Sequence, residues 1–190
     1  SFFMCKINDM NVQLKTDRLI LRRPAPKDAE RMTAFMQNFP VVSMLAVPPW
    51  PYKRSDADDY IARVQQPGEK GGYSFAITFR DGDERDLYLG NVSLFQRTEP
   101  YVSKDWEVGY WLGQPYWRQG IMREALRAVL AFGFETVKLD KIMAGYFVDN
   151  IPSAALLQQM GFTKVEQNKM MCVARGHEVD HVATQCSAKT

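Results

Sequence analysis

One short segment, residues 115–122 (PYWRQGIM), combines residue types that can bind an anion. Arg118 and Arg123 place two positive charges around Gly120, and a helical pattern of apolar residues follows directly. The first N–H groups of a helix have no partners inside it and together carry roughly half a positive charge. A glycine lets the backbone approach a ligand closely, so this junction predicts a phosphate or pyrophosphate site. The alternative is an ordinary connecting loop, because many such loops contain a glycine and an arginine and bind nothing.

A second segment, residues 150–162 (NIPSAALLQQMGF), follows the next apolar stretch of the chain. Asn150 comes first, Ser153 can cap a helix over 153–160, and Gly161 suits the C-terminal end of that helix. Taken alone, this segment predicts only a well-capped helix.

Residues 177–181 (HEVDH) match the H-E-x-x-H pattern of zinc proteases and contain both histidines of the chain. Zinc binding by this pattern requires a helix, which places the two histidines one turn apart on one face. Gly176 and the valines nearby instead indicate a turn that enters a strand, in which the two rings stand roughly 13 Å apart. That separation is too large for one metal ion, so we expect no metal site. His181 is retained as a candidate for a substrate cleft.

A predicted β-α-β unit positions these segments, with strands at 106–112 and 142–148 and a long helix over 119–137. Its crossover makes the two strands parallel, and ligands of such units lie beyond the carboxyl ends of the strands. The junction at 115–122 lies at such an end. The helix is predicted from one apolar stripe, which contains Met122, Ala125, Leu126, Val129, Leu130 and Gly133.

The N-terminal half predicts a strand at 18–24 and a helix at 27–39. Ser55 is expected to cap a second helix at 56–66. Between the helices, residues 47–52 (VPPWPY) predict a rigid aromatic loop, which either lines a substrate entrance or only covers the core. Further strands are expected at 73–79, 87–97, 163–172 and 180–186.

The composition indicates one folded domain over residues 1–190. Of the 190 residues, 46% are hydrophobic, so the chain can bury a core. Lys plus Arg number 24 against 22 Asp plus Glu, and no charged block indicates a nucleic-acid partner. The three cysteines, Cys5, Cys172 and Cys186, are widely spaced, which suggests a cytoplasmic protein. No apolar stretch approaches the ~20 residues of a membrane span.

Three longer segments carry a family resemblance: LKTDRLILRRPAPKDAE, EVGYWLGQPYWRQGIMREALRAVLAFGFE and VDNIPSAALLQQMGF. In combination they resemble the GNAT superfamily of acyl-CoA N-acetyltransferases, specifically its RimJ/RimL-like branch, over residues 12–186. The resemblance implies an α/β (α+β) fold, a single GNAT-type domain with a mixed, mostly antiparallel twisted sheet. This sheet is expected to be splayed between two parallel strands and flanked by about four helices.

The resemblance also implies acetyl-CoA as co-substrate, without a metal. The pyrophosphate of coenzyme A is expected on backbone amides of the loop before the long helix, and the pantetheine chain beside the preceding strand. Asn150 and Ser153 match further positions that contact this co-substrate. The loop residues are Arg118, Gln119, Gly120, Ile121, Met122 and Arg123, and the strand residues are Tyr110, Trp111 and Leu112.

The chain departs from the wider family pattern at two loop positions. Trp117 stands where a Gln or Arg is usual, and Met122 where a Gly or Ala is usual. Because the expected binding is through the backbone, it tolerates both changes.

Acetyl transfer requires a neutral amine and therefore a group that takes up a proton. The pKa of a lysine side chain is about 10.4, whereas that of an α-amine is about 7.7–8. Glu107 is the candidate base, because burial among Trp106, Tyr110 and Trp111 would raise its pKa. The alternatives are a surface charge at the strand end or a structural hydrogen-bond acceptor.

The oxyanion and the leaving thiolate also need partners. Backbone N–H groups near Gly109–Trp111 are candidate donors to the oxyanion. Many members of the family place a tyrosine four residues before the glycine of the Gly-Phe pair. Leu157 stands there in this chain, so Ser153 is the candidate that assists the thiolate.

The resemblance predicts an N-acetyltransferase that acts by direct attack on a primary amine, most simply a protein N-terminal α-amine of ribosomal-protein type. Two alternatives stay open: a small-molecule N-acetyltransferase for an amino acid, peptide or antibiotic, and a catalytically idle acyl-CoA-binding module. The expected partner is the amine acceptor, without nucleic acid or membrane. A homodimer is left open.

Overall fold

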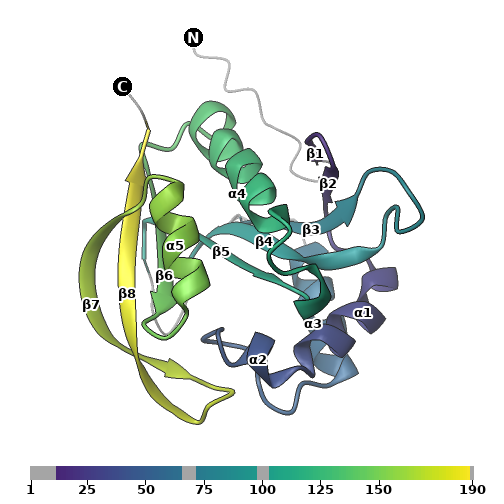
Figure 1. Cartoon of the computed structure of the whole chain (residues 1–190), viewed down its shortest axis with the longest axis horizontal. Coiled ribbons are helices and arrows are strands. Elements are labelled where there is room, and N and C mark those ends of the chain that lie inside the picture. Colours follow the sequence, from purple (N-terminus) through teal and green to yellow (C-terminus); the bar gives the residue numbers. More distant parts are fainter. Residues whose placement is uncertain (1–11, 66–71, 98–102, 189–190) are drawn as a thin grey trace.

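The computed structural model describes residues 12–65, 72–97 and 103–188. The two ends of the predicted domain 1–190, with Cys5, lie outside this part of the chain, as does the last residue of the predicted helix 56–66. The described residues form one eight-stranded sheet in the order β1-β2-β3-β4-β5-β6-β8-β7, with helices on both faces (Figure 1). The strands are β1 (Leu14–Lys15), β2 (Leu19–Arg22), β3 (Tyr73–Phe79), β4 (Tyr88–Gln96), β5 (Trp106–Leu112), β6 (Lys141–Phe147), β7 (Thr163–Cys172) and β8 (His177–Ser187).

Neighbouring strands are antiparallel except for β5 and β6, which run parallel. β4 pairs with β5 along its whole length, whereas β5 and β6 share one register pair, Glu107 with Met143. This pair lies near the start of both strands, so β5 and β6 diverge toward their carboxyl ends. The predicted mixed sheet, splayed between two parallel strands, is therefore confirmed.

Five α-helices surround this sheet in the described part of the chain. Figure 1 shows α4 and α5 together on the near face of the sheet. The helices are α1 (Ala29–Met36), α2 (Phe39–Val42), α3 (Arg54–Gln65), α4 (Ile121–Ala131) and α5 (Ile151–Gln159), and Phe132–Thr136 continues α4 as a π-helical turn.

The helix expected at 27–39 ends early, at Met36. Asn38 adopts an extended backbone, and α2 starts at Phe39 with Pro40 in its first turn. Proline has no N–H to donate and suits a first turn, so a new helix starts here in place of a longer α1.

Two predicted helix caps are wrong. Ser55 lies inside the first turn of α3, where the Asp56 carboxylate accepts a hydrogen bond from the backbone N–H of Lys53 at 2.6 Å. Asn150, not Ser153, caps α5, because Asn150 Oδ1 accepts a hydrogen bond from the backbone N–H of Ser153 at 3.3 Å. The hydroxyl of Ser153 is thereby left for another partner.

The sheet separates two apolar clusters. The stripe predicted for α4 faces the first cluster, where Ile121 is fully buried and Met122 only partly. Burying one such aliphatic side chain contributes roughly 1.5–3 kcal/mol, so the start of α4 is held firmly against the sheet. Helices α1, α2 and α3 cover the second cluster, which includes Met32, Val42, Ala57, Tyr88 and Phe147.

Part of the aromatic loop at 47–52 packs into the second cluster. Tyr52 is buried and its hydroxyl contacts the sulfur of Met32, whereas Trp50 is partly exposed and packs edge-on against Phe39.

In the ranges that the structure describes, no helix has the length and apolar character to cross a membrane.

Candidate active site

The loop between β5 and α4 presents a run of backbone N–H groups. Gly120 adopts a left-handed backbone with φ +73°, and Arg118 does so with φ +60°. Left-handed residues beside a helix start turn successive N–H groups toward a common concavity that suits an anion. Within the described residues, the N–H groups of 118–123 donate to no backbone or side-chain acceptor. The anion site at this loop stays a prediction, which these unpaired N–H groups support.

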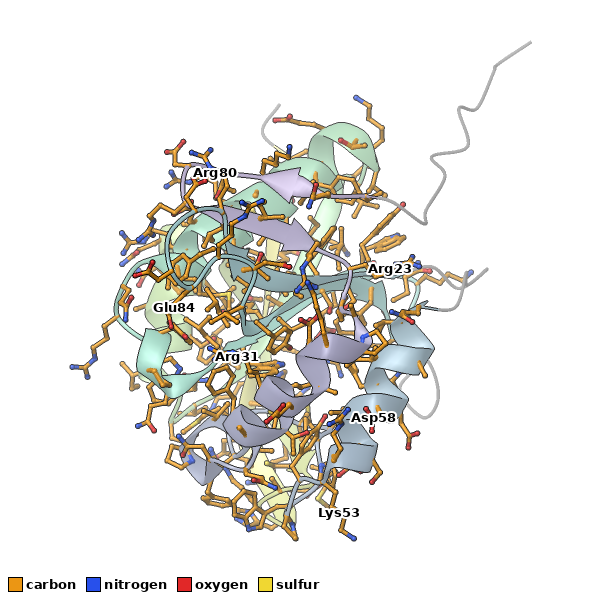
Figure 2. The ribbon with its side chains drawn as sticks, turned by 90° about the vertical axis from the view of Figure 1, so that its right-hand side faces the viewer. Arg23, Arg31, Lys53, Asp58, Arg80 and Glu84 are labelled. Carbon is orange, nitrogen blue, oxygen red and sulfur yellow. The ribbon has the colours of Figure 1, made fainter. Side chains whose placement is uncertain are left out.

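Contacts from two distant segments and from the nearby end of β5 hold this loop. Tyr116 accepts a hydrogen bond from Arg31 of α1 (2.6 Å) and donates one to Glu84 of the β3–β4 turn (2.9 Å). Figure 2 labels both charged residues, on the side of the molecule where α1 lies. Trp117 Nε1 donates to the carbonyl oxygen of Leu112 at 2.7 Å. The aromatic residues of PYWRQGIM thus anchor the loop, while its backbone stays available.

Arg18, at the start of β2, was not predicted as part of the site. Its Nη1 donates to the carbonyl oxygen of Gln119 at 3.1 Å, and its Nε pairs with Glu124 at 2.7 Å. Burial acts to raise the pKa of Glu124, but hydrogen bonds from Thr16 and Arg18 lower it below its usual value. Glu124 is therefore a stable anchor for Arg18, and through it for the loop.

The two predicted loop cations differ from Arg18. Arg118 and Arg123 are both exposed, and neither forms an ion pair with any residue of the described ranges. Their positive charges are free to attract a phosphate group to the N-terminus of α4.

Tyr110 and Ser153 meet between β5 and α5. The Tyr110 hydroxyl and Ser153 Oγ lie 2.8 Å apart, and the Asn150 cap holds the backbone of Ser153. Burial raises the pKa of Tyr110 to about 12, although the hydrogen bond with Ser153 acts in the opposite sense. Tyr110 thus keeps its proton near neutral pH and can donate a hydrogen bond. Leu157 of α5, in contrast, is buried in the first apolar cluster.

The other predicted strand residues do not share this position. Trp111 points to the opposite face, where its ring lies 5.8 Å from that of Tyr88. The carbonyl of Leu112 is already engaged by Trp117. Alternation along the strand turns Trp111 away, whereas Leu112 lies on the same face as Tyr110 with its side chain buried in the first cluster.

A cavity of about 150 Å³ lies around the single β5–β6 pair. Met143 and Gly145 line it and lie on the same face of β6 as Phe147 of the second cluster, so the cavity opens on the face opposite α4 and α5. Its polar lining contains Arg97, Ser103, Asp105, Glu107, Glu166, Asn168 and His181.

Glu107 lines this cavity in an ion pair with Arg97. Both carboxylate oxygens accept hydrogen bonds from the guanidinium, one of them at 2.6 Å, and the Glu107 side chain is 16% exposed. Bidentate pairs of this kind are among the stronger hydrogen bonds of proteins. The expected surroundings of Glu107 are wrong in part, because Trp106 and Tyr110 belong to the cluster on the other face of the sheet.

The HEVDH segment lies in β8, so its assignment to a strand is confirmed. His177 is exposed at the start of β8, whereas His181 is buried and lines the cavity. Across the three described ranges, no cluster of three or more His, Cys, Asp or Glu side chains is placed to hold a metal ion.

The chain is similar to acetyltransferases over most of its length. Residues 18–163 match the family model described as acetyltransferase (GNAT) domain. The [ribosomal protein uS5]-alanine N-acetyltransferase of Escherichia coli (strain K12) is 30% identical over 189 residues, covering 96% of this chain and 94% of that protein. The uncharacterized N-acetyltransferase YoaA of Bacillus subtilis (strain 168) is 32% identical over 155 residues, covering 80% and 82%.

Solved structures agree on the fold. RimL, a ribosomal L7/L12 alpha-N-protein acetyltransferase solved in complex with coenzyme A, has a TM-score of 0.75 to this chain at 16% identity. The match covers 93% of this chain and 98% of RimL. Because the family model spans most of the chain, the chain belongs to the GNAT family and is an acetyl-CoA-dependent acetyltransferase.

Proposed function

We propose that this acetyltransferase acetylates the N-terminal α-amine of a protein. The observation that carries the proposal is the cavity on the face opposite the phosphate-binding loop. Its carboxylates, Asp105, Glu107 and Glu166, outnumber its one lining cation, Arg97. A cleft lined by one sign of charge concentrates ligands of the other sign, so this cavity suits a cationic amine.

The size of the cavity favours a small first residue. A dry cavity of about 150 Å³ in another protein accommodates a molecule the size of benzene. The volume here, about 150 Å³, gives room for an amine and a short side chain, but not for an aminoglycoside. The relative from Escherichia coli, whose name specifies an alanine of a ribosomal protein, supports the same choice.

The phosphates of acetyl-CoA are assigned to the loop before α4. The N–H groups of Gln119, Gly120, Ile121 and Met122 lie between the side chains of Arg118 and Arg123, and none of them has an acceptor in the described part of the chain. The pantetheine chain is assigned to the free edge of β5 beside Tyr110, Trp111 and Leu112, and Asn150 to the far side of the gap. N–H groups of the same edge, near Gly109–Trp111, are the proposed donors to the oxyanion.

Tyr110 and Ser153 are proposed to assist the leaving thiolate by hydrogen bonding. The pKa of Tyr110 is about 12, well above the value of about 8.5 for an ordinary thiol, so complete transfer of its proton is unfavourable. A hydrogen bond to the thiolate needs no such transfer. Holding the two reactants together supplies the larger share of the rate enhancement.

Glu107 is proposed to attract and orient the amine. Its carboxylate is engaged in a bidentate ion pair with Arg97 and faces the cavity together with two further carboxylates, which suits attraction of a cationic amine. Each oxygen keeps a further lone pair for an N–H group of the acceptor.

The test is a panel of acceptors, with release of free thiol as the measure of turnover. It compares peptides that begin with Ala, Ser, Leu or Trp, the same peptides with a blocked N-terminus, free amino acids, and an aminoglycoside. We expect transfer to the α-amine of peptides with a small first residue, located by mass spectrometry. Transfer to lysine side chains of the blocked peptides, or to free amino acids or the aminoglycoside alone, would contradict the proposal.

A further inference from the structure

We propose that Nε2 of His181 accepts the proton that the amine releases during acetyl transfer, and that Glu166 and Asn168 hold His181 in the required tautomer. This inference rests on the proposed entry of the amine into the cavity around Glu107. It concerns a histidine of β8 that lies far along the chain from the loop that binds phosphate.

Hydrogen-bond chemistry assigns the tautomer. Asn168 Nδ2 donates to Glu166 Oε1 at 2.9 Å, and because a carboxylate only accepts, this contact fixes the orientation of the Asn168 amide. Asn168 Oδ1 therefore faces His181 Nδ1, at 3.0 Å. An amide oxygen also only accepts, so Nδ1 must carry the proton. In a neutral ring, Nε2 then has a free lone pair.

The position of Nε2 agrees with this role. The His181 ring lies over Gly145 of β6 so closely that a Cβ on this glycine would stand 2.2 Å from Nε2. Nε2 has no hydrogen-bond partner within the ranges described, and it is not among their fully buried unsatisfied atoms. His181 and Gly145 both line the cavity. The lone pair is therefore exposed to the space that the amine is proposed to enter.

The surroundings keep His181 neutral. Burial lowers the pKa of His181, and the positive charge of Arg97 lowers it further, while Glu107 and Glu166 act in the opposite sense. Asp105 also faces the cavity, in an ion pair with Lys141, and Arg175 lies on the ring of Phe147, which His181 contacts edge-on. A base must be unprotonated before the reaction, so a lowered pKa leaves His181 ready near neutral pH.

The proposed step balances protons and electrons. The neutral amine nitrogen forms a bond to the thioester carbonyl carbon, and its surplus proton moves to Nε2 of His181. The carbon–sulfur bond breaks and its electron pair leaves with the sulfur, which takes up one proton from water. His181 then returns its proton to solvent. Amine and thioester have become amide and thiol, with no net proton gained or lost.

The first test needs no acceptor and is therefore independent of the proposed substrate. The protein is labelled with ¹⁵N-histidine, and His181→Gln and His177→Gln assign the two rings in NMR spectra at neutral pH. We expect His181 to carry its proton on Nδ1. A proton on Nε2 would overturn the inference.

The second test is kinetic and uses an acceptor from the panel. His181→Gln is expected to lower kcat about 100-fold with an unchanged Kd for acetyl-CoA, and His177→Gln, at an exposed site of the same strand, to match the native protein. Asn168→Asp places a carboxylate beside Nδ1, which raises the pKa of His181. The acid limb of the kcat/KM profile should therefore move to higher pH. The amine titrates equally with each variant, so only the difference between profiles is assigned to His181.

Two results would overturn the inference in this assay. One is a kcat of His181→Gln within twofold of the native value. The other is an Asn168→Asp profile that superposes on that of the native protein. If thermal melting shows that His181→Gln does not fold, the tautomer and the Asn168→Asp profile decide. Absence of transfer to every acceptor would contradict the proposed substrate, while the NMR test would still decide on His181.

Discussion

The two sides of the split sheet are built by different means. On the face of α4 and α5, the loop at 118–123 offers backbone N–H groups, and only Tyr110 and Ser153 add side-chain hydroxyls. On the opposite face, the cavity is lined by charged and polar side chains that pair with one another, such as Arg97 with Glu107. One side is proposed to bind through the main chain and the other through side chains.

A site built from backbone groups can be common to a whole family, whereas a site built from side chains is particular to one chain. A backbone site is expected to tolerate substitutions such as Trp117 and Met122, because most side chains leave the N–H groups unchanged. A side-chain site changes its chemistry with each substitution. We therefore expect variants of the loop to affect acetyl-CoA, and variants of the cavity to affect the amine.

The largest effect is expected from Gly120→Asp. Gly120 has φ +73°, which strains any side chain, and an added Cβ would meet nothing closer than 3.5 Å; the variant also places a negative charge among the N–H groups. We expect binding of acetyl-CoA to weaken at least about 100-fold by calorimetry. Gly176→Asp is the control, since Gly176 also has φ +73° and open space around it. An unchanged affinity of Gly120→Asp would place the phosphate site elsewhere.

Ser153→Ala and Tyr110→Phe test whether the two hydroxyls act on the reaction. Each is expected to lower kcat about 10-fold, with at most a twofold change in the Kd for acetyl-CoA. Since the two hydroxyls lie 2.8 Å apart, the double variant should lose little more than the worse single variant. Equal losses in kcat and in affinity would reduce Ser153 to a binding residue.

Glu107→Gln tests the acceptor side. We expect the KM for the amine to rise about 10-fold while the Kd for acetyl-CoA stays the same, because a neutral amide attracts a cation less strongly. The effect should weaken at high salt. Asp58→Asn is the control: it removes the exposed pair with Arg54, and Asp58 lies on α3, away from the cavity lining (Figure 2). A change in acetyl-CoA affinity with an unchanged KM would contradict the assignment of acetyl-CoA to the loop and of the amine to the cavity.

The smallest effect is expected from Glu124→Gln, which loosens Arg18 from the loop. We expect about a threefold loss of acetyl-CoA affinity and a loss of about 1 kcal/mol in the free energy of unfolding at pH 7. The pKa of Glu124 is lowered by folding, so its contribution is present above the unfolded pKa of about 4.3 and is lost as the pH falls through the folded pKa. Urea denaturation at pH 7 and pH 3 checks this; an equal difference at both pH values would contradict it.

The strands and the long helix are predictable because their patterns are local. β3 and β5 match the predicted bounds of 73–79 and 106–112. The caps were less predictable, because Asn150 and Ser153 are both good capping residues and only the backbone conformation decides between them. The same limit explains why the helix at 27–39 was predicted as one.

Some features of the candidate site are visible in the sequence and others are not, for the same reason. The junction before α4 is marked by a glycine beside a helix start, and both are visible in the sequence. Arg18 lies 101 residues from Gln119 in the sequence, and no residue pattern around Arg18 predicts that contact. The partner of Glu107 was also missed, because the antiparallel pairing of β4 with β5 decides that Arg97 reaches it.

The sequence alone therefore determined the family and the places of most strands along the chain, and it predicts the phosphate site before α4, since each depends on local pattern and on the backbone. Only the tertiary structure decided the chemistry of the amine side. Asn168 and His181 face each other because β7 and β8 pair in one particular register, and a shift by one residue would turn both side chains away. Side-chain sites of this kind are set by strand register, which no short stretch of sequence encodes.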